Sequence, residues 1–276
     1  MPELPEVETV RLGLAKHVIG KKIRKIQVHH SRATAPKSLA PLSSLAGSKI
    51  KGVSRRGKFL WFELDRPEVL VAHLGMSGQF LISKAIEMPQ RHMRVRIDLG
   101  RLELRFIDQR TFGWLAVENT AEGVPTSASH IARDPFDPEF DLDVCVARFM
   151  AKRTEIKRAL LDQEVISGVG NIYADETLWR SKVHPETRCE KMKPGKVREV
   201  ILNATKVMRE ALAQGGTSFD ELYINVNGES GYFERSLAVY GREGESCPKC
   251  HSAIRRIRFA NRSSHFCPKC QPRPRA

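Results

Sequence analysis

The sequence predicts an α+β protein with a strand-rich first part, a helical second part and a small cysteine-rich end. Three observations support this fold class. Seven short apolar runs rich in β-branched residues fill residues 22–117, helical periodicity dominates beyond residue 138, and two Cys-x-x-Cys pairs occur within residues 247–276. Because the strands follow one another without intervening helices, we expect an antiparallel sandwich or barrel rather than βαβ units.

The first expected element is an amphipathic helix from Leu4 to Gly20. Apolar residues recur there at three- to four-residue intervals, and Gly20 supplies a stop. Pro5 suits a first helical turn, and Glu3 and Glu6 complement the helix dipole. The segment therefore reads first as a well-formed helix start.

The same segment also has a chemical interpretation. Removal of Met1 would leave Pro2 with a free secondary amine, and α-amino groups titrate near pH ~8. Amine nucleophiles attack carbonyl-type carbons to form Schiff bases, and a secondary amine forms an iminium ion. Glu3 would stand beside this amine as a proton donor or acceptor.

The remaining elements follow in order. Strands are expected at residues 22–30, 49–53, 59–64, 69–74, 93–99, 102–107 and 114–117, with a tight hairpin at Leu99–Leu102. Residues rich in Gly, Pro, Ser, Thr and Asp then form a linker. Helices are expected at residues 144–150, 156–161, 171–179 and 195–214. These patterns predict domains at 1–125, 139–240 and 241–276, joined by a linker at 126–138.

The net charge of the chain indicates its kind of partner, and its hydropathy indicates whether it enters a membrane. The 276 residues carry a net charge of +14, which favours a polyanion such as nucleic acid over a generic basic enzyme. From Cys247 onward there are eight Lys or Arg and no acidic residue. No uncharged apolar run approaches the ~18 residues of a membrane span, and no signal peptide is apparent. We expect a soluble, intracellular protein.

The four paired cysteines predict a metal site. Cys247 and Cys250 are followed, after sixteen residues, by Cys267 and Cys270, which is the spacing of a structural zinc site. Four thiolates leave no open position on Zn²⁺, so the ion should be structural. Alternation in residues 253–259 predicts a β-hairpin between the pairs. Its arginines, Arg255, Arg256, Arg258 and Arg262, would meet a phosphate backbone.

Three glycine-rich turns carry further candidates. Gly168-Val-Gly-Asn171 leads into a helix and offers amides to a phosphate, although many such turns only reverse the chain. Met76 in His73-Leu-Gly-Met-Ser-Gly78, together with Arg110 and Phe112 in Asp108–Gly113, could fill the gap left when a base is extracted from DNA. Ordinary core packing is the alternative for both apolar side chains.

Together these residues resemble bacterial formamidopyrimidine-DNA glycosylases over nearly the whole chain. The resemblance is carried by Pro2-Glu3-Leu4-Pro5-Glu6, Lys58, residues 73–78, Arg110 with Phe112, residues 168–171 and the four-cysteine hairpin. It implies an N-terminal β-sandwich domain, a helix–two-turn–helix domain whose residues 217–240 cover the lesion, and a β-hairpin zinc finger.

The resemblance also implies a mechanism and its residues. It makes Pro2 the nucleophile, Glu3 the residue that moves protons at the sugar, Lys58 and Arg262 the proton donors for β- and δ-elimination, and Glu6 a supporting group. The DNA contacts it implies are His73, Met76, His92, Arg110, Phe112, Arg153, Lys157 and Asn171.

The implied function is removal of 8-oxoguanine and formamidopyrimidines, followed by strand cleavage at the abasic site. The partner is double-stranded DNA containing oxidised bases or abasic sites, and the protein is expected to act as a monomer in the bacterial cytoplasm, associated with the nucleoid. Two alternatives stay open. One is the endonuclease VIII chemistry on oxidised pyrimidines, and the other is a protein that binds damaged DNA without cutting it.

Overall fold

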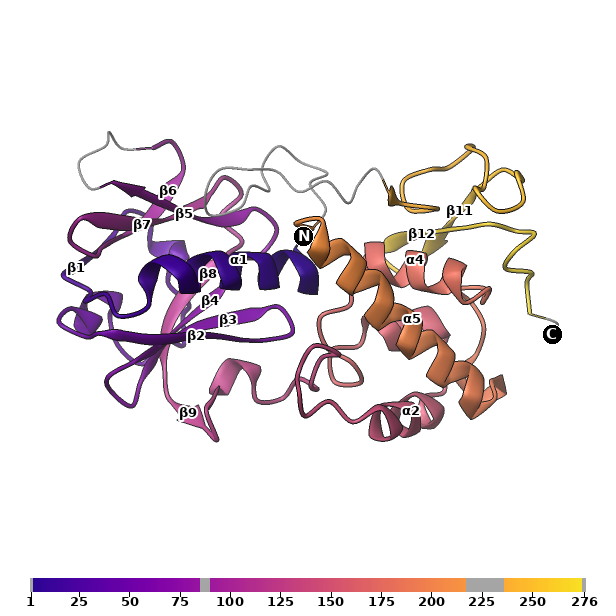
Figure 1. Ribbon diagram of the computed structural model, residues 1–276, viewed down its shortest axis with the longest axis horizontal. Coiled ribbons are helices and arrows are strands. Elements are labelled where there is room, and N and C mark those ends of the chain that lie inside the picture. The colour runs from indigo at the N-terminus through magenta and orange to yellow at the C-terminus, as the bar shows by residue number, and fades with distance from the viewer. Residues whose placement is uncertain (1, 85–89, 217–235, 275–276) are drawn as a thin grey trace. The chain divides into compact units, whose positions relative to one another are not determined.

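The computed structural model describes residues 2–84, 90–216 and 236–274. The chain divides into two compact units. The first contains the described residues up to His130 together with residues 214–216, and the second contains Ile131–Ala213 and the described residues from Ser236 onward. Figure 1 draws the chain from indigo at its N-terminus to yellow at its C-terminus.

Two four-stranded antiparallel sheets form the first unit. One sheet has the order β1 (Lys25–Val28), β6 (Met93–Asp98), β7 (Leu102–Asp108) and β5 (Gly78–Lys84). The other has the order β2 (Ile50–Arg56), β3 (Phe59–Leu64), β4 (Val69–His73) and β8 (Trp114–Glu118). The two separate sheets confirm the sandwich and exclude the barrel.

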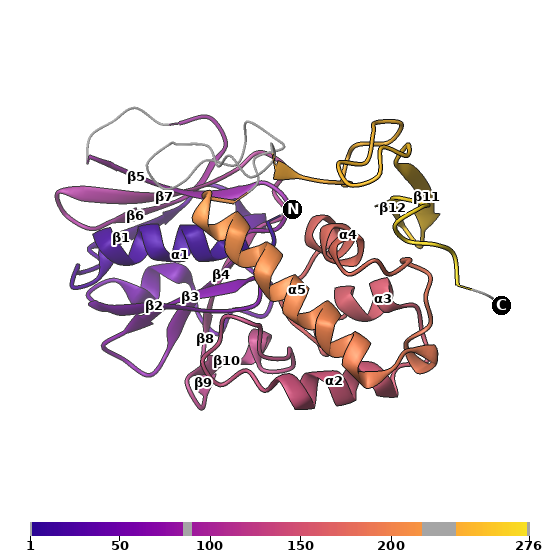
Figure 2. The same cartoon turned by 45° about the vertical axis from the view of Figure 1, so that its right-hand side comes forward.

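Helix α1 (Leu4–Val18) contributes to the core of this sandwich. Its apolar stripe, which includes the fully buried Val7 and Leu14, joins side chains from both sheets in one cluster. The rings of Phe62 and Phe106 flank that of Phe80, with centroids 5.7 and 5.2 Å away. In Figures 1 and 2, α1 lies between the two sheets. The sandwich therefore fixes the helix that begins beside Pro2.

The structure adds elements that the sequence patterns did not predict. Strand β5 begins at Gly78, where the expected flexible turn ends, and pairs with β7 along its whole length. Its starting glycine hid the strand pattern that follows. Residues 120–128 contain a short hairpin of β9 (Thr120–Ala121) and β10 (Val124–Pro125), followed by a 3₁₀ turn at Thr126–Ala128. Further 3₁₀ turns span Ser31–Ala33, Leu42–Leu45 and Cys189–Lys191.

The second unit is built from the four predicted helices. These are α2 (Leu142–Ala151), α3 (Ile156–Leu161), α4 (Asn171–Arg180) and α5 (Pro194–Ala213). The buried face of α5 packs against α2 and α4. Among the helices that the structure describes, none is long and apolar enough to cross a membrane.

The turns between α3 and α4 are closed by one side chain. The Gln163 amide group donates hydrogen bonds to the carbonyls of Leu161 and Val169, at 2.9 and 3.0 Å, and its oxygen accepts one from the Gly168 amide at 2.9 Å. Gly168 has φ +89°, a left-handed conformation that favours glycine. The turns thus deliver Asn171 to the first position of α4 in a fixed geometry.

The predicted β-hairpin follows near the end of the chain. Strands β11 (Arg255–Phe259) and β12 (Arg262–Phe266) pair antiparallel in register, with Phe259 opposite Arg262 across a two-residue turn. Strand β12 packs against α4. The cysteine-rich end is therefore part of the second unit's core.

Candidate active site and metal centre

The start of α1 holds two acidic side chains in place. The backbone N–H of Glu3 donates to a Glu6 carboxylate oxygen at 2.8 Å, and the Val7 N–H donates to the Glu3 carbonyl at 3.1 Å. Pro2, Glu3 and Glu6 are all buried. The helix-start interpretation is thus correct, and it is compatible with the chemical one because these bonds fix the backbone of Glu3, the residue that follows Pro2.

The backbone at Gly216 approaches Glu6 closely. A Cβ added at this residue would lie 2.9 Å from a Glu6 carboxylate oxygen, and Gly216 has φ +85°. Both facts require glycine there.

Lys58 and His73 lie near each other in the first unit. Lys58 is half-buried between β2 and β3, and His73 ends β4, opposite Phe59 in the register. Burial, and then the positive charge of Lys58, lower the pKa of His73 to about 4. The imidazole is therefore neutral at neutral pH. Its Nδ1 accepts a hydrogen bond from the Gly75 N–H at 3.2 Å.

Met76 and Phe112 are both exposed, with 38% and 53% of their surface accessible. The core-packing alternative is therefore wrong for both. The Arg110 guanidinium lies 5.2 Å from the centroid of the Phe112 ring. A Cβ added at Gly75 would lie 2.4 Å from the Phe112 carbonyl carbon, so the two turns touch through their backbones. This contact presents the two apolar side chains from adjoining turns.

A buried carboxylate that sequence reasoning missed holds these turns together. Asp108, which is 0% exposed, accepts hydrogen bonds from the Ser77 hydroxyl, from the Arg110 N–H at 3.1 Å and from the Gly113 N–H at 2.6 Å. Its own N–H donates to the carbonyl of His92, another predicted DNA contact, at 3.0 Å. Asp108 thus connects the segments that carry Met76, His92, Arg110 and Phe112.

The other predicted site residues belong to the second unit. Arg153 and Arg262 are exposed, and Arg262 begins β12 beside the hairpin turn. Asn171 donates its amide N–H to the Ser263 carbonyl at 3.1 Å. Lys157 is fully buried, with its Nζ 2.7 Å from an Asp175 carboxylate oxygen. Its expected phosphate contact stays a prediction, and in this structure the ammonium is directed toward the hairpin. Residues 217–235 of the expected lesion-covering loop lie outside the described residues.

The four predicted cysteines come together at the base of the hairpin. Their sulfur atoms all lie within 4.8 Å of one another, with Cys250 and Cys267 at 3.3 Å and Cys247 and Cys270 at 4.0 Å. Tetrahedral Zn²⁺ with bonds of about 2.3 Å needs sulfur atoms about 3.8 Å apart, so the set fits. The Trp179 indole donates to the Cys247 sulfur at 3.4 Å. This set has four thiolate ligands and no open position, so it is a structural zinc site.

Two features show that Cys145 and Cys189 take no part in zinc binding. Burial raises the pKa of Cys145 to about 12 and that of Cys189 to about 11. Neither belongs to the four-sulfur cluster. Both thiols are therefore protonated and pack as small apolar groups.

Glu176, also missed by sequence reasoning, anchors the chain that enters the zinc hairpin. Its carboxylate accepts hydrogen bonds from the backbone N–H groups of Ala238, Val239 and Tyr240, each at 2.9 Å. Burial raises its pKa. No spacing rule links an acidic helical residue to amides more than sixty residues later, so no sequence signal pointed to this role.

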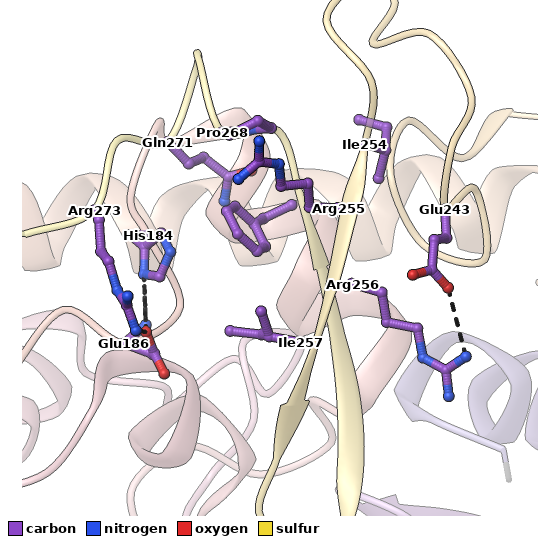
Figure 3. A pocket seen from close by; sticks show the side chains of 11 residues that line it. His184, Glu186, Glu243, Ile254, Arg255, Arg256, Ile257, Pro268, Gln271 and Arg273 are labelled. Carbon is purple, nitrogen blue, oxygen red and sulfur yellow. Dashed lines mark hydrogen bonds and ion pairs between the residues drawn. The ribbon is translucent and has the colours of Figure 1, made fainter.

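A cavity of about 420 Å³ adjoins the hairpin (Figure 3). His184 lies on one side of the cavity, and the centroid of its ring is 4.6 Å from that of the Phe266 ring. The Arg273 guanidinium forms an ion pair with the Glu186 carboxylate at 3.1 Å. Burial lowers the pKa of His184. No predicted catalytic residue lines this cavity, so we do not assign the reaction to it.

These parts define a class of protein. A buried Pro2-Glu3 pair, exposed apolar side chains on adjoining turns, a glycine turn before a helix and a zinc hairpin rich in arginine are the components of a DNA glycosylase with a zinc finger. Family models agree over most of the chain. The formamidopyrimidine-DNA glycosylase N-terminal domain matches residues 1–115, its H2TH domain residues 131–221, and the zinc finger found in FPG and IleRS residues 244–273.

Individual relatives extend the match to the full chain. The formamidopyrimidine-DNA glycosylase of a Nocardioides species is 52% identical over 283 residues, covering 100% of this chain and 96% of that protein. A Lactococcus lactis FPG mutant in complex with Fapy-dG-containing DNA has a TM-score of 0.90 and 32% identity, covering 99% and 100% of the two chains. MutM in complex with DNA containing carbocyclic 8-oxo-G has a TM-score of 0.88 at the same identity and coverage. The chain belongs to the formamidopyrimidine-DNA glycosylase family, enzymes of base excision repair that combine DNA glycosylase and abasic-site lyase activities.

Proposed function

We propose that this chain removes 8-oxoguanine and formamidopyrimidines from duplex DNA and then cleaves the strand by β,δ-elimination through a Schiff base on Pro2. The observation that carries the proposal is the start of α1, where the buried Pro2 precedes Glu3 and Glu6 binds the Glu3 N–H, in a chain that matches this family along its whole length. DNA with Fapy-dG or carbocyclic 8-oxo-G, held by two solved relatives, supports oxidised purines as substrates.

The steps follow from the chemistry of the residues. The free Pro2 amine attacks C1′ of the damaged nucleotide, the bond from C1′ to the base breaks, and the base leaves with its electron pair and the proton that the Pro2 nitrogen loses. Glu3 supplies a proton as the sugar ring opens, which yields an iminium ion. The iminium makes the C2′ hydrogen acidic, so loss of that proton breaks the 3′ C–O bond, with Lys58 protonating the leaving phosphate. A second elimination breaks the 5′ C–O bond with a proton from Arg262, and water then releases Pro2.

Binding requires phosphate contacts and a filled gap. The exposed Met76, Arg110 and Phe112 would replace the extracted nucleotide in the stack. The residues proposed to contact phosphates or the estranged base are His92, Arg110, Arg153, Lys157, Asn171 and Arg262, and His73 is a further proposed DNA contact. With several phosphate contacts, DNA binding should weaken steeply as salt rises.

Borohydride trapping tests the covalent step. Reduction in the presence of an abasic-site duplex should link the protein to DNA one to one, and Pro2 should carry the link. Intact mass must first show that Met1 has been removed, since a retained Met1 would turn the amine into an amide. Absence of an adduct from protein with a free Pro2 would exclude the mechanism and leave DNA binding alone.

Matched lesion duplexes test the substrate. Excision of 8-oxoguanine should be faster than excision of thymine glycol under single-turnover conditions. Faster excision of thymine glycol would show instead that oxidised pyrimidines are the preferred substrates.

The organisation of the protein completes the proposal. We infer a catalytic domain at residues 1–125, a linker at 126–138, a helix–two-turn–helix domain with its lesion-covering loop at 139–240 and a zinc finger at 241–276. The protein would work as a monomer in the bacterial cytoplasm, in association with the nucleoid.

A further inference from the structure

We propose that Asp175 is a positioning residue for Arg262, acting from α4 through Lys157 on the tip of the zinc hairpin. This inference rests on the proposed function, in which Arg262 supplies the proton for δ-elimination. Asp175 is absent from the predicted site residues, and it does not reach the exposed hairpin tip itself.

The first argument is the outer edge of β12. Because Phe259 pairs with Arg262 across the two-residue turn, alternate residues of β12 direct their backbone groups away from β11. The N–H of His265 donates to an Asp175 carboxylate oxygen at 2.8 Å. The carbonyl of Ser263 accepts from Lys157 at 3.0 Å and from Asn171 at 3.1 Å. Side chains of α3 and α4 thus form hydrogen bonds with the outward backbone groups of β12, which would otherwise be free to pair with another strand.

The second argument is that Asp175 fixes the position of Lys157. Both side chains are 0% exposed, and the Asp175 oxygen that pairs with Lys157 at 2.7 Å also accepts from the Ser264 hydroxyl at 2.8 Å. A buried ammonium needs a compensating charge nearby. The carboxylate therefore determines where the Lys157 ammonium rests beneath the hairpin.

The third argument is that Lys157 touches both arms of the tip. Its Nζ bonds the Ser263 carbonyl on β12 and lies 5.4 Å from the centroid of the Phe259 ring on β11. Arg262 lies between Phe259 and Ser263 in the chain, at the end of the turn through Ala260, which has φ +51°. Displacing a proton donor by about 1 Å can slow a reaction about 100-fold. The cation beneath the tip therefore controls the step assigned to Arg262.

The test is Asp175→Asn in the full-length zinc-loaded protein. The Asp175 carboxylate accepts from three donors, which are Lys157, the Ser264 hydroxyl and the His265 N–H. The amide of Asn has only one acceptor oxygen and carries a donor in place of the other, so it cannot keep all three bonds that hold β12 and Lys157. We expect the δ-to-β product ratio on an abasic-site duplex to fall about tenfold. Borohydride trapping through Pro2, excision of 8-oxoguanine and zinc content should change less than about threefold.

Two further variants make the outcome specific. Glu176→Gln removes a neighbouring buried carboxylate that holds residues 238–240, and it should lower stability without changing the product ratio. Arg262→Gln sets the reference. If it leaves the product ratio unchanged, the role proposed for Arg262 fails. If Arg262→Gln changes the ratio and Asp175→Asn does not, the inference about Asp175 is wrong.

Lys157→Met combined with Asp175→Asn separates positioning from folding. Removing both charges of a buried pair should restore much of the lost thermal stability. The product ratio should stay low because the tip still lacks its cation. Recovery of the ratio in step with stability would reduce Asp175 to a structural residue and overturn the proposal.

Discussion

Replacing Asp108 should destabilise the first unit and misplace the side chains that we propose to fill the DNA stack. Asp108→Ala leaves two buried donors, the Ser77 hydroxyl and the Gly113 N–H, without their acceptor, whereas the Arg110 N–H keeps its second bond, to the Ser77 hydroxyl oxygen at 3.1 Å. The Gly113 N–H is buried. Each orphaned donor costs ~1–3 kcal/mol, so the total should be about 3–5 kcal/mol.

Thermal unfolding measures this cost. A loss of 3–5 kcal/mol corresponds to a fall in Tm of roughly 10 °C for a domain of this size. Asp108→Asn keeps one acceptor oxygen and should lose about half as much. Excision of 8-oxoguanine should fall more than cleavage at a preformed abasic site, because only the former requires the base to be extracted.

A matched control is available on the same sheet. The Asp98 carboxylate accepts one hydrogen bond, from the Gly100 N–H at 2.7 Å, at the hairpin turn. Asp98→Asn should lower Tm by no more than about 4 °C and leave excision unchanged. A Tm for Asp108→Ala within 2 °C of the parent protein would refute the reasoning, since two buried donors without an acceptor should cost more free energy than that.

Three further outcomes are expected. Met76→Ala and Phe112→Ala should unfold at nearly the parent temperature, because both side chains are exposed, yet excise 8-oxoguanine at least tenfold more slowly in single-turnover assays. Because the pKa of His73 is lowered from 6.5 to about 4 in the folded protein, the unfolded chain binds a proton first. The free energy of unfolding should therefore decrease as pH falls from 6.5 toward 4, and His73→Gln should lessen that slope in urea titrations. Cys267→Ser should bind no zinc by metal analysis and lose DNA binding in a gel-shift assay, while the β-sandwich keeps its circular-dichroism signal.

Local patterns were sufficient for most of the architecture. The helix at α1 and the strands β3 and β4 follow from side-chain periodicity, which depends on neighbours a few residues away. The zinc ligands follow from the spacing of two cysteine pairs. Strand β5 was not predicted because its sequence begins with a glycine that also ends a turn.

Roles that depend on distant partners could not be predicted in this way. Lys157 looks like a surface cation in sequence, but its burial depends on Asp175 on the next helix and on Ser263, which lies 106 residues away. Asp108 reads as an ordinary strand end until the turn around Ser77 is folded beside it. These contacts arise from tertiary structure, and their residue types alone do not distinguish a structural carboxylate from a solvated one.

The two edges of the zinc hairpin also differ in what they permit between molecules. Side chains of the helical unit close one edge, whereas β11 belongs to a sheet with no third strand among the described residues. An open strand edge invites pairing with the same strand of another copy, which leads to aggregation. Here that edge carries the exposed Arg256 and Arg258, whose charges repel an identical strand. The arginines of β11 thus also oppose the pairing of this edge with a second copy of the chain.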